Sequence, residues 1–367
     1  MVTKLFICST PLQLINIINL RLTVGDDSKA TLYLYNQSKV FDELFQRIIT
    51  TKLFTNVYYL DTIKFNHRHW IRKIKYIRYI IDTINYINHK KISKKFIDDP
   101  EKYNEFWVST MDRSSWMFFM TYKKRNPLIE LNFFEDGLGS YTMLLTEQSK
   151  VSQYLLTFLG FKSYLEEMKS LYVYNPKLCE QSSKNGTSVL SMPSIQGNQK
   201  LDQFIYDIFK FDLKKFPKNV IFFEQPFPQK DNWSNQRDLI LWLSKKLKEP
   251  LFIKMHPRSK SYKYSNCQVI SSISVPMEYI YANFNIENNT LISVFSTACL
   301  SPFYMFNKEP QVILLYKCLG LDKKNDYDPK FIKFITKIKN SYKQKDRFLI
   351  PATLEELENI LLKKGLI

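Results

Sequence analysis

The sequence predicts an α/β protein of two domains, and three observations carry this prediction. Short β-prone runs alternate with helical stretches along most of the chain, a rhythm that indicates parallel sheets covered by helices. The chain has 367 residues, which suits two hydrophobic cores better than one. With 45% hydrophobic and 24% charged residues, the composition is that of a globular protein and excludes a disordered or fibrous one.

The first half opens with a strand, a turn and a helix. Residues 3–8 form a β-prone run, Ser9 or Thr10 can cap the following helix, and Pro11 suits a first helical turn. Periodicity then predicts further elements in chain order: a strand at 30–36, a helix at 42–54, and strands at 56–60, 105–110 and within 128–141.

The second half repeats this rhythm after a polar, turn-rich stretch at 175–200. We interpret this stretch as an interdomain linker, which places one domain at 1–185 and the other at 200–367. Helical stretches such as 235–247 then separate five predicted strands, at 219–226, 250–257, 267–272, 289–296 and 310–316. We expect the two domains to face each other across a cleft, with ligands at the carboxyl ends of the strands.

The strongly basic charge balance points to an anionic partner. A formal net charge of +18 favours nucleic acid, anionic lipid or an acidic substrate. Nine Lys or Arg residues fall within 67–96, where isoleucines share one helical face. This segment is interpreted either as a solvated helix on the first domain or as an amphipathic helix on an anionic membrane surface. Nucleic-acid contact is a third interpretation, although no helix-turn-helix, zinc-finger or RNP motif supports it.

Cysteine usage and the N-terminus indicate the compartment. Five cysteines without CxxC or Cys/His metal spacing are typical of reduced core residues in a cytosolic protein. The N-terminus has no convincing signal peptide, because Ser9, Thr10 and Pro11 interrupt a short apolar run. No segment reaches the roughly 18 apolar residues of a membrane span. We therefore expect a cytoplasmic protein.

Three polar motifs follow predicted strands, and the first is Glu135-Asp136-Gly137. A plain turn is one explanation, since Asp-Gly is a common turn dipeptide. The functional interpretation is that Asp136 acts as a general base and that Gly137 lets a substrate approach the backbone closely. Like-charge repulsion from Glu135 would then favour proton uptake by Asp136. Glu135 is also a candidate for direct contact with the substrate.

The second motif is His256-Pro257. His256 stands apart from the other three histidines, which all lie in the basic segment 67–96. A structural role is one interpretation. The other is that Lys254 and Arg258 bring positive charge to a bound phosphate, to which His256 donates a proton or a strong hydrogen bond.

The third motif is Ser296-Thr297, which follows a predicted strand and opens a predicted helix. The pair is explained by an ordinary N-cap or by an anion site of hydroxyl and amide groups. The combination is more specific than any single motif: an acidic-Gly turn in the first domain, then His-Pro and Ser-Thr in the second.

This combination resembles the bacterial sialyltransferases, which have a GT-B fold of two Rossmann-like domains and carry D/E-D/E-G, HP and S-S/T motifs. The chain length, the opening CSTPLQLINI and the spacing of about 40 residues from His256 to Ser296 are most similar to glycosyltransferase family 52. That family includes lipooligosaccharide and capsule sialyltransferases. The resemblance covers most of the chain.

The resemblance implies a role for each matched residue. His256 would protonate or hydrogen-bond the phosphate of the departing CMP, and Ser296 and Thr297 would bind the same phosphate. Glu278 would hold nucleotide hydroxyls, and Asp136 would take the proton from the acceptor hydroxyl.

The base has a second candidate. Within family 52 this role belongs to an acidic residue roughly twenty positions before the HP histidine, which here points to Asp231 or Glu224. No metal or other cofactor is expected, because the leaving group is a nucleoside monophosphate and the sequence has no convincing DxD pair. Homodimers occur in the resembling family.

The function implied is an inverting transfer of sialic acid from CMP-sialic acid to a galactose-ended surface glycan. The basic segment would bring the enzyme to the inner face of the cytoplasmic membrane, where lipid-linked acceptors lie. One alternative is a transferase of the same family that uses a UDP-hexose donor. The other is a non-enzymatic nucleic-acid or membrane-surface binding protein, which predicts tight, salt-sensitive binding and no turnover.

Overall fold

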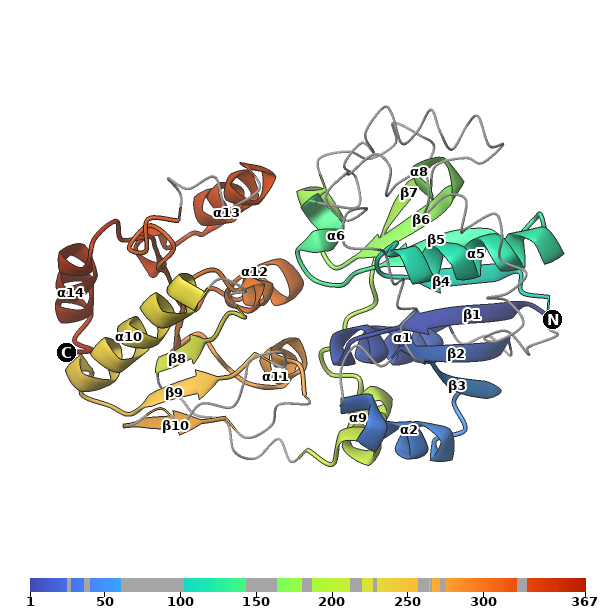
Figure 1. Cartoon of the computed structure of the whole chain (residues 1–367), viewed down its shortest axis with the longest axis horizontal. Coiled ribbons are helices and arrows are strands. Elements are labelled where there is room, and N and C mark those ends of the chain that lie inside the picture. The colour runs from blue at the N-terminus through green and yellow to red at the C-terminus, as the bar shows by residue number, and fades with distance from the viewer. Residues whose placement is uncertain are drawn as a thin grey trace. The chain divides into compact units, whose positions relative to one another are not determined.

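The chain divides into two compact units. The computed structural model describes residues 1–24, 28–35, 40–60, 102–142, 164–179, 187–211, 220–226, 230–256, 264, 266–270, 275–321 and 329–367. The first unit consists of Met1–Ser194 with Lys200–Ile208, and the second of Ile195–Gln199 with Phe209–Ile367. Each unit is built on its own sheet (Figure 1).

The first unit holds a seven-stranded parallel sheet in the order β3-β2-β1-β4-β5-β6-β7. Its strands are β1 (Thr3–Cys8), β2 (Lys29–Tyr35), β3 (Asn56–Leu60), β4 (Glu105–Val108), β5 (Glu130–Phe134), β6 (Met168–Val173) and β7 (Ser188–Ser191). Its helical elements are α1 (Pro11–Val24), α2 (Val40–Thr50), α5 (Arg113–Arg125), α6 (Gly139–Thr142), α8 (Tyr164–Glu167), η2 (Pro176–Leu178) and α9 (Gln199–Phe209).

Aromatic and aliphatic side chains cover this sheet. Phe118 of α5 makes edge contacts with Tyr33 of β2, and Phe119 does so with Phe106 of β4. The helix α1 is unusual, because polar Asn16 is as fully buried as its aliphatic neighbours. A helix that is buried on all sides must satisfy such groups internally, and α1 thereby ties the first strand to loops at the carboxyl edge of the sheet.

The second unit holds a six-stranded parallel sheet in the order β10-β9-β8-β11-β12-β13. Its strands are β8 (Val220–Phe223), β9 (Leu251–Lys254), β10 (Cys267–Val269), β11 (Thr290–Ser293), β12 (Gln311–Leu314) and β13 (Phe348–Leu349). Its helical elements are α10 (Lys230–Lys246), α11 (Met277–Asn283), η3 (Thr297–Cys299), α12 (Ser301–Phe306), α13 (Pro329–Ser341), η4 (Lys345–Arg347) and α14 (Leu354–Lys363). The central strands β8 and β11 are buried throughout, as expected for a parallel sheet covered on both faces.

The α/β prediction is confirmed, but the domain boundary differs from the predicted linker at 175–200. Residues Ser188–Ser191 form β7, the edge strand of the first sheet. The helix α9 also belongs largely to the first unit, where Arg47 Nη1 donates to the carbonyl oxygen of Ile208 at 3.1 Å. The sequence did not predict β7, because three of its four residues are exposed and serines at both ends interrupt any apolar run.

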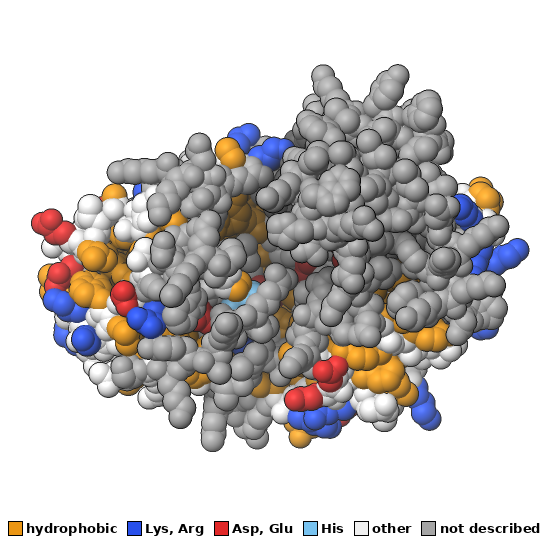
Figure 2. Space-filling view, viewed as in Figure 1, with side chains coloured by type: hydrophobic (Ala, Val, Ile, Leu, Met, Phe, Trp, Pro, Cys, Tyr) orange, Lys and Arg blue, Asp and Glu red, His pale blue; other side chains and the backbone are white. Residues whose placement is uncertain are grey.

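The basic segment 67–96 lies outside the described residues, so its predicted helix stays a prediction. On the face drawn in Figure 2, the described Lys and Arg side chains are dispersed among acidic and hydrophobic ones instead of forming a single stripe. Among the helices that the structure describes, none combines the length and the apolar character needed to cross a membrane.

Candidate active site

The carboxyl ends of three neighbouring strands define the site of the second unit. Phe223 at the end of β8 pairs in register with Lys254 of β9 and with Ser293 of β11. Because parallel strands end at the same edge of a sheet, the residues that follow them leave the sheet together. Glu224 and His256 follow two of these strands within two residues, and Ser296 follows the third within three.

The turn after β11 is fixed by its own hydroxyl groups. Ser293 Oγ donates to the carbonyl oxygen of Phe223 at 2.9 Å and accepts the backbone N–H of Ser296 at 2.9 Å. Ser296 is then the N-cap of η3, since its Oγ accepts from the N–H of Ala298 at 3.3 Å. The predicted N-cap is thus present. A hydroxyl that accepts this bond can still donate its own proton to an anion.

Ser296, Thr297 and His256 are all partly accessible at this edge. His256 lies two residues beyond β9, and Ser296 and Thr297 begin the turn beyond β11. The strand β8 separates β9 from β11 in the sheet. The imidazole and the two hydroxyl groups therefore arise from strands on either side of Glu224.

Lys254 does not lie open as a phosphate ligand would. Its side chain is buried, and its Nζ donates to the carbonyl oxygen of Val275 at 3.3 Å. Burial lowers the pKa of Lys254 to about 8, and the carboxylate of Glu278 opposes this shift. Glu278 itself is buried in the first turn of α11. The sequence predicted a phosphate contact for Lys254, whereas its surroundings favour a role in holding α11 and Glu278.

This burial makes stability depend on pH. The pKa of Lys254 falls from 10.5 to about 8 on folding, so the folded state resists protonation. Below about pH 8 both states carry the proton and the full cost of roughly 3 kcal/mol applies. Between pH 8 and 10.5 the unfolded state binds more protons, so this contribution to stability rises with pH.

We expect the unfolding free energy of the wild type, relative to that of Lys254→Met, to increase as the pH rises through this interval. Denaturant unfolding at pH 7.5, 9 and 10.5 measures this difference. The surface variant Lys246→Met, whose partner Glu358 is also exposed, serves as the control. A difference between wild type and Lys254→Met that stays constant with pH would contradict the assignment.

In the first unit, Asp136 is held at the carboxyl edge by the α1 turn. Gln13 Nε2 donates to Asp136 Oδ2 at 2.8 Å, and Thr10 Oγ1 donates to Oδ1 at 3.4 Å. The orientation of the Gln13 amide is fixed, because its oxygen accepts from the N–H of Ser9 at 2.6 Å. Only the amide nitrogen is then left to face Asp136. The carboxylate is partly accessible and anchored, as a general base must be.

Glu135 faces the protein interior. It is 1% exposed, and its Oε2 accepts from Tyr141 Oη at 2.6 Å and from the N–H of Tyr174 at 2.7 Å. Its carbonyl oxygen accepts from Asn16 Nδ2 at 2.8 Å. The predicted direct substrate contact for Glu135 therefore gives way to a structural role, in which this residue holds the loop that carries Asp136.

Gly137 makes the turn possible. Its φ of 76° lies in the left-handed region that side chains disfavour. The N–H of Asp136 donates to Ser140 Oγ at 2.9 Å and closes the turn. The turn interpretation and the functional one are thus compatible, since the turn is what presents Asp136 at the edge.

Three predicted residues have no described side chain. Pro257 and Arg258 lie outside the described residues, and Asp231 lies in α10 at a position where no side chain is described. Their predicted roles stay predictions. In the described ranges, no group of three or more His, Cys, Asp or Glu side chains is arranged to hold a metal ion.

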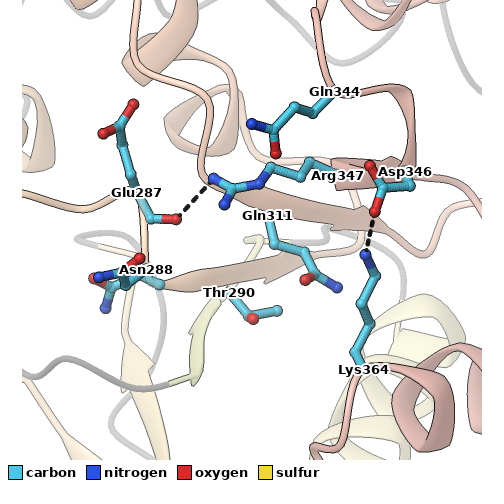
Figure 3. A pocket seen from close by; sticks show the side chains of 9 residues that line it. Glu287, Asn288, Thr290, Gln311, Gln344, Asp346, Arg347 and Lys364 are labelled. Carbon is cyan, nitrogen blue, oxygen red and sulfur yellow. Dashed lines mark hydrogen bonds and ion pairs between the residues drawn. The ribbon is translucent and has the colours of Figure 1, made fainter.

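A polar pocket of about 340 Å³ lies elsewhere in the second unit (Figure 3). Its lining includes Thr290 and Gln311, the first residues of β11 and β12, so it opens at the amino edge of the sheet. Arg347 Nη1 donates there to the carbonyl oxygen of Glu287 at 3.1 Å. The pocket is therefore separate from the residues that follow the carboxyl ends of the strands.

Solved structures identify the fold. The chain is similar to the glycotransferase of kitacinnamycin, with a TM-score of 0.55 and 8% identity over 99% of this chain and 90% of that chain. It is also similar to UGT71G1 of Medicago truncatula complexed with UDP-glucose, with a TM-score of 0.54 and 10% identity over 98% and 89% of the two chains. The two-domain α/β architecture is the GT-B fold of glycosyltransferases.

The family follows from the sequence match. The model of the alpha-2,8-polysialyltransferase (POLYST) family matches residues 4–316, and the chain belongs to that family. It is thus a glycosyltransferase of a sialyltransferase family, as the three motifs predicted. No curated protein matches the chain.

Proposed function

We propose that this chain is an inverting sialyltransferase that transfers sialic acid from CMP-sialic acid to a hydroxyl of a surface glycan. The observation that carries the proposal is the extent of the family match, which includes all three motifs, from Glu135 through His256 to Thr297. The similarity to lipooligosaccharide and capsule enzymes of glycosyltransferase family 52 is part of this proposal.

The proposed reaction is a single displacement. Asp136 takes the proton from the acceptor hydroxyl as its oxygen forms a bond to the anomeric carbon of sialic acid. The bond from that carbon to the CMP phosphate oxygen breaks at the same time, and the configuration inverts. His256 gives a proton to the departing phosphate, while Ser296 and Thr297 donate hydrogen bonds to it.

No metal takes part in this proposal. CMP leaves with one phosphate, which carries less charge than the diphosphate of a UDP-sugar donor. An imidazolium and two hydroxyl groups can stabilise that charge. The second unit offers these groups at one edge of its sheet, at His256, Ser296 and Thr297.

The acceptor is a glycan of the cell surface. The family resemblance implies a galactose-ended lipooligosaccharide or capsular chain, and from the name alpha-2,8-polysialyltransferase we add a sialic-acid chain as a second candidate acceptor. Both acceptors present a hydroxyl to the same base, so the proposal for Asp136 holds with either.

CMP release from CMP-sialic acid tests the donor. We expect purified enzyme to release CMP faster when lactose or a short sialic-acid oligomer is added, and equally fast with EDTA present. A panel of UDP-sugars in the same assay should give no acceptor-dependent turnover. Mass spectrometry of the acceptor should show the added sialic acid.

Two other results would change the proposal. Turnover of a UDP-sugar without turnover of CMP-sialic acid would replace the donor and leave the glycosyltransferase class intact. Loss of CMP release in EDTA, restored by Mg²⁺ or Mn²⁺, would overturn the metal-independent mechanism.

A further inference from the structure

Glu224 is a buried acid at the centre of the second sheet's carboxyl edge. It is the first residue after β8, and its side chain is 2% exposed. Oε1 accepts from Tyr264 Oη at 2.7 Å, and the backbone N–H donates to the carbonyl oxygen of Lys254 at 3.1 Å. Oε2 is also buried but has no hydrogen-bond partner among the residues that the structure describes.

An unsatisfied buried carboxylate oxygen lowers the stability of the fold unless a ligand provides a hydrogen-bond donor. A buried acceptor left without a hydrogen bond destabilises a fold, and a charged acceptor does so more strongly. Oε1 of this carboxylate accepts from Tyr264, so the side chain is held in one orientation. The stability lost at Oε2 would be recovered when a ligand brings an O–H or N–H donor to this oxygen.

The location of Glu224 limits which part of a ligand it can contact. Glu224 directly follows β8, the strand between β9, which leads to His256, and β11, which leads to Ser296. Those two residues are the proposed phosphate contacts. A carboxylate repels a phosphate, so Glu224 cannot share that part of the ligand. It suits a neutral hydroxyl or amino group of the nucleoside or sugar that the phosphate connects.

We propose that Glu224 Oε2 accepts a hydrogen bond from a hydroxyl or amino group of the bound nucleotide sugar. Glu224 is then a donor-binding residue, whereas the sequence considered it only as a candidate base. Because Tyr264 holds Oε1, Oε2 is placed to select a ligand group that donates a hydrogen bond and to reject an analogue that lacks this group. This inference rests on the proposed function, which supplies the nucleotide sugar.

The test compares binding with stability in Glu224→Gln. We expect the Kd for CMP, for CMP-sialic acid or for both to rise at least tenfold in isothermal titration without acceptor. The Kd for inorganic phosphate should stay unchanged. The Tm should stay the same or rise, because the amide removes a buried charge. The exposed Glu358→Gln variant is the matched control and should change no Kd.

Tyr264→Phe keeps the test decisive if Glu224→Gln does not fold. This change removes only the hydroxyl that holds Oε1, and we expect it to raise the same Kd by about threefold or more. Unchanged nucleotide affinity in folded Glu224→Gln, with or without a lower Tm, would overturn the inference and leave Oε2 to a bound water.

The two proposals fail separately. Wild-type enzyme that binds UDP instead of CMP, with that affinity lost in Glu224→Gln, would support the role of Glu224 and overturn the CMP donor. Wild-type binding of CMP that survives Glu224→Gln would leave the donor in place and overturn the role of Glu224.

Discussion

His256→Ala is expected to lower the kcat of sialyl transfer by about 10²-fold or more, as removal of a positioned proton donor does. The phosphate of CMP would then leave without a proton or a strong hydrogen bond from the imidazole. The Kd for the donor should change far less, because Ser296 and Thr297 remain. Steady-state rates and donor binding measured on the same preparation separate these two effects.

His89→Ala provides the matched control, since it removes a histidine of the basic segment far from the HP motif in sequence. It should leave kcat unchanged. Full activity of folded His256→Ala would reject the assignment of His256 as the acid. A defect confined to KM would instead make it a donor-binding residue.

Much of the fold could be predicted because a buried parallel strand is a continuous apolar run. Val220–Phe223 and Leu251–Lys254 were both recognisable in this way, and each is buried almost throughout. The edge strand Ser188–Ser191 and the two-residue strand Phe348–Leu349 lacked that signal. Their position depends on neighbouring strands, which the local sequence does not encode.

The sequence indicates candidate site residues, but it does not show how neighbouring side chains differ. Glu135 and Asp136 are adjacent carboxylates, yet Tyr141 and Tyr174 draw the first inward while Gln13 holds the second at the edge. These contacts join residues up to 123 positions apart. Only the folded chain can therefore show which carboxylate remains accessible.

Lys254 shows what charge in the sequence leaves open. A lysine beside a histidine predicted positive charge for a phosphate, and charge alone could not show where the ammonium group points. In the fold it donates to the Val275 carbonyl oxygen and is buried near Glu278. The described contacts of Lys254 are thus with the interior of the second unit.

Asp136→Asn is expected to lower kcat by about 10²- to 10⁴-fold while the Kd for CMP-sialic acid stays unchanged. The amide preserves the shape of the side chain but cannot take the proton of the acceptor hydroxyl. Donor binding should be preserved because the proposed donor contacts all lie in the second unit, whereas Asp136 lies in the first. Transfer rates and donor titration together check this prediction.

Asp112→Asn is the matched control within the first unit. Asp112 caps α5 by accepting the N–H of Ser115 at 2.7 Å, and an Asn cap satisfies the same donor with little loss of stability. This variant should keep full kcat. If folded Asp136→Asn also kept full kcat, the base would have to be sought at Asp231 or Glu224, the two acids to which the family resemblance also points. If Asp136→Asn lost donor affinity as well, Asp136 would contact the donor, and its role would extend beyond proton transfer.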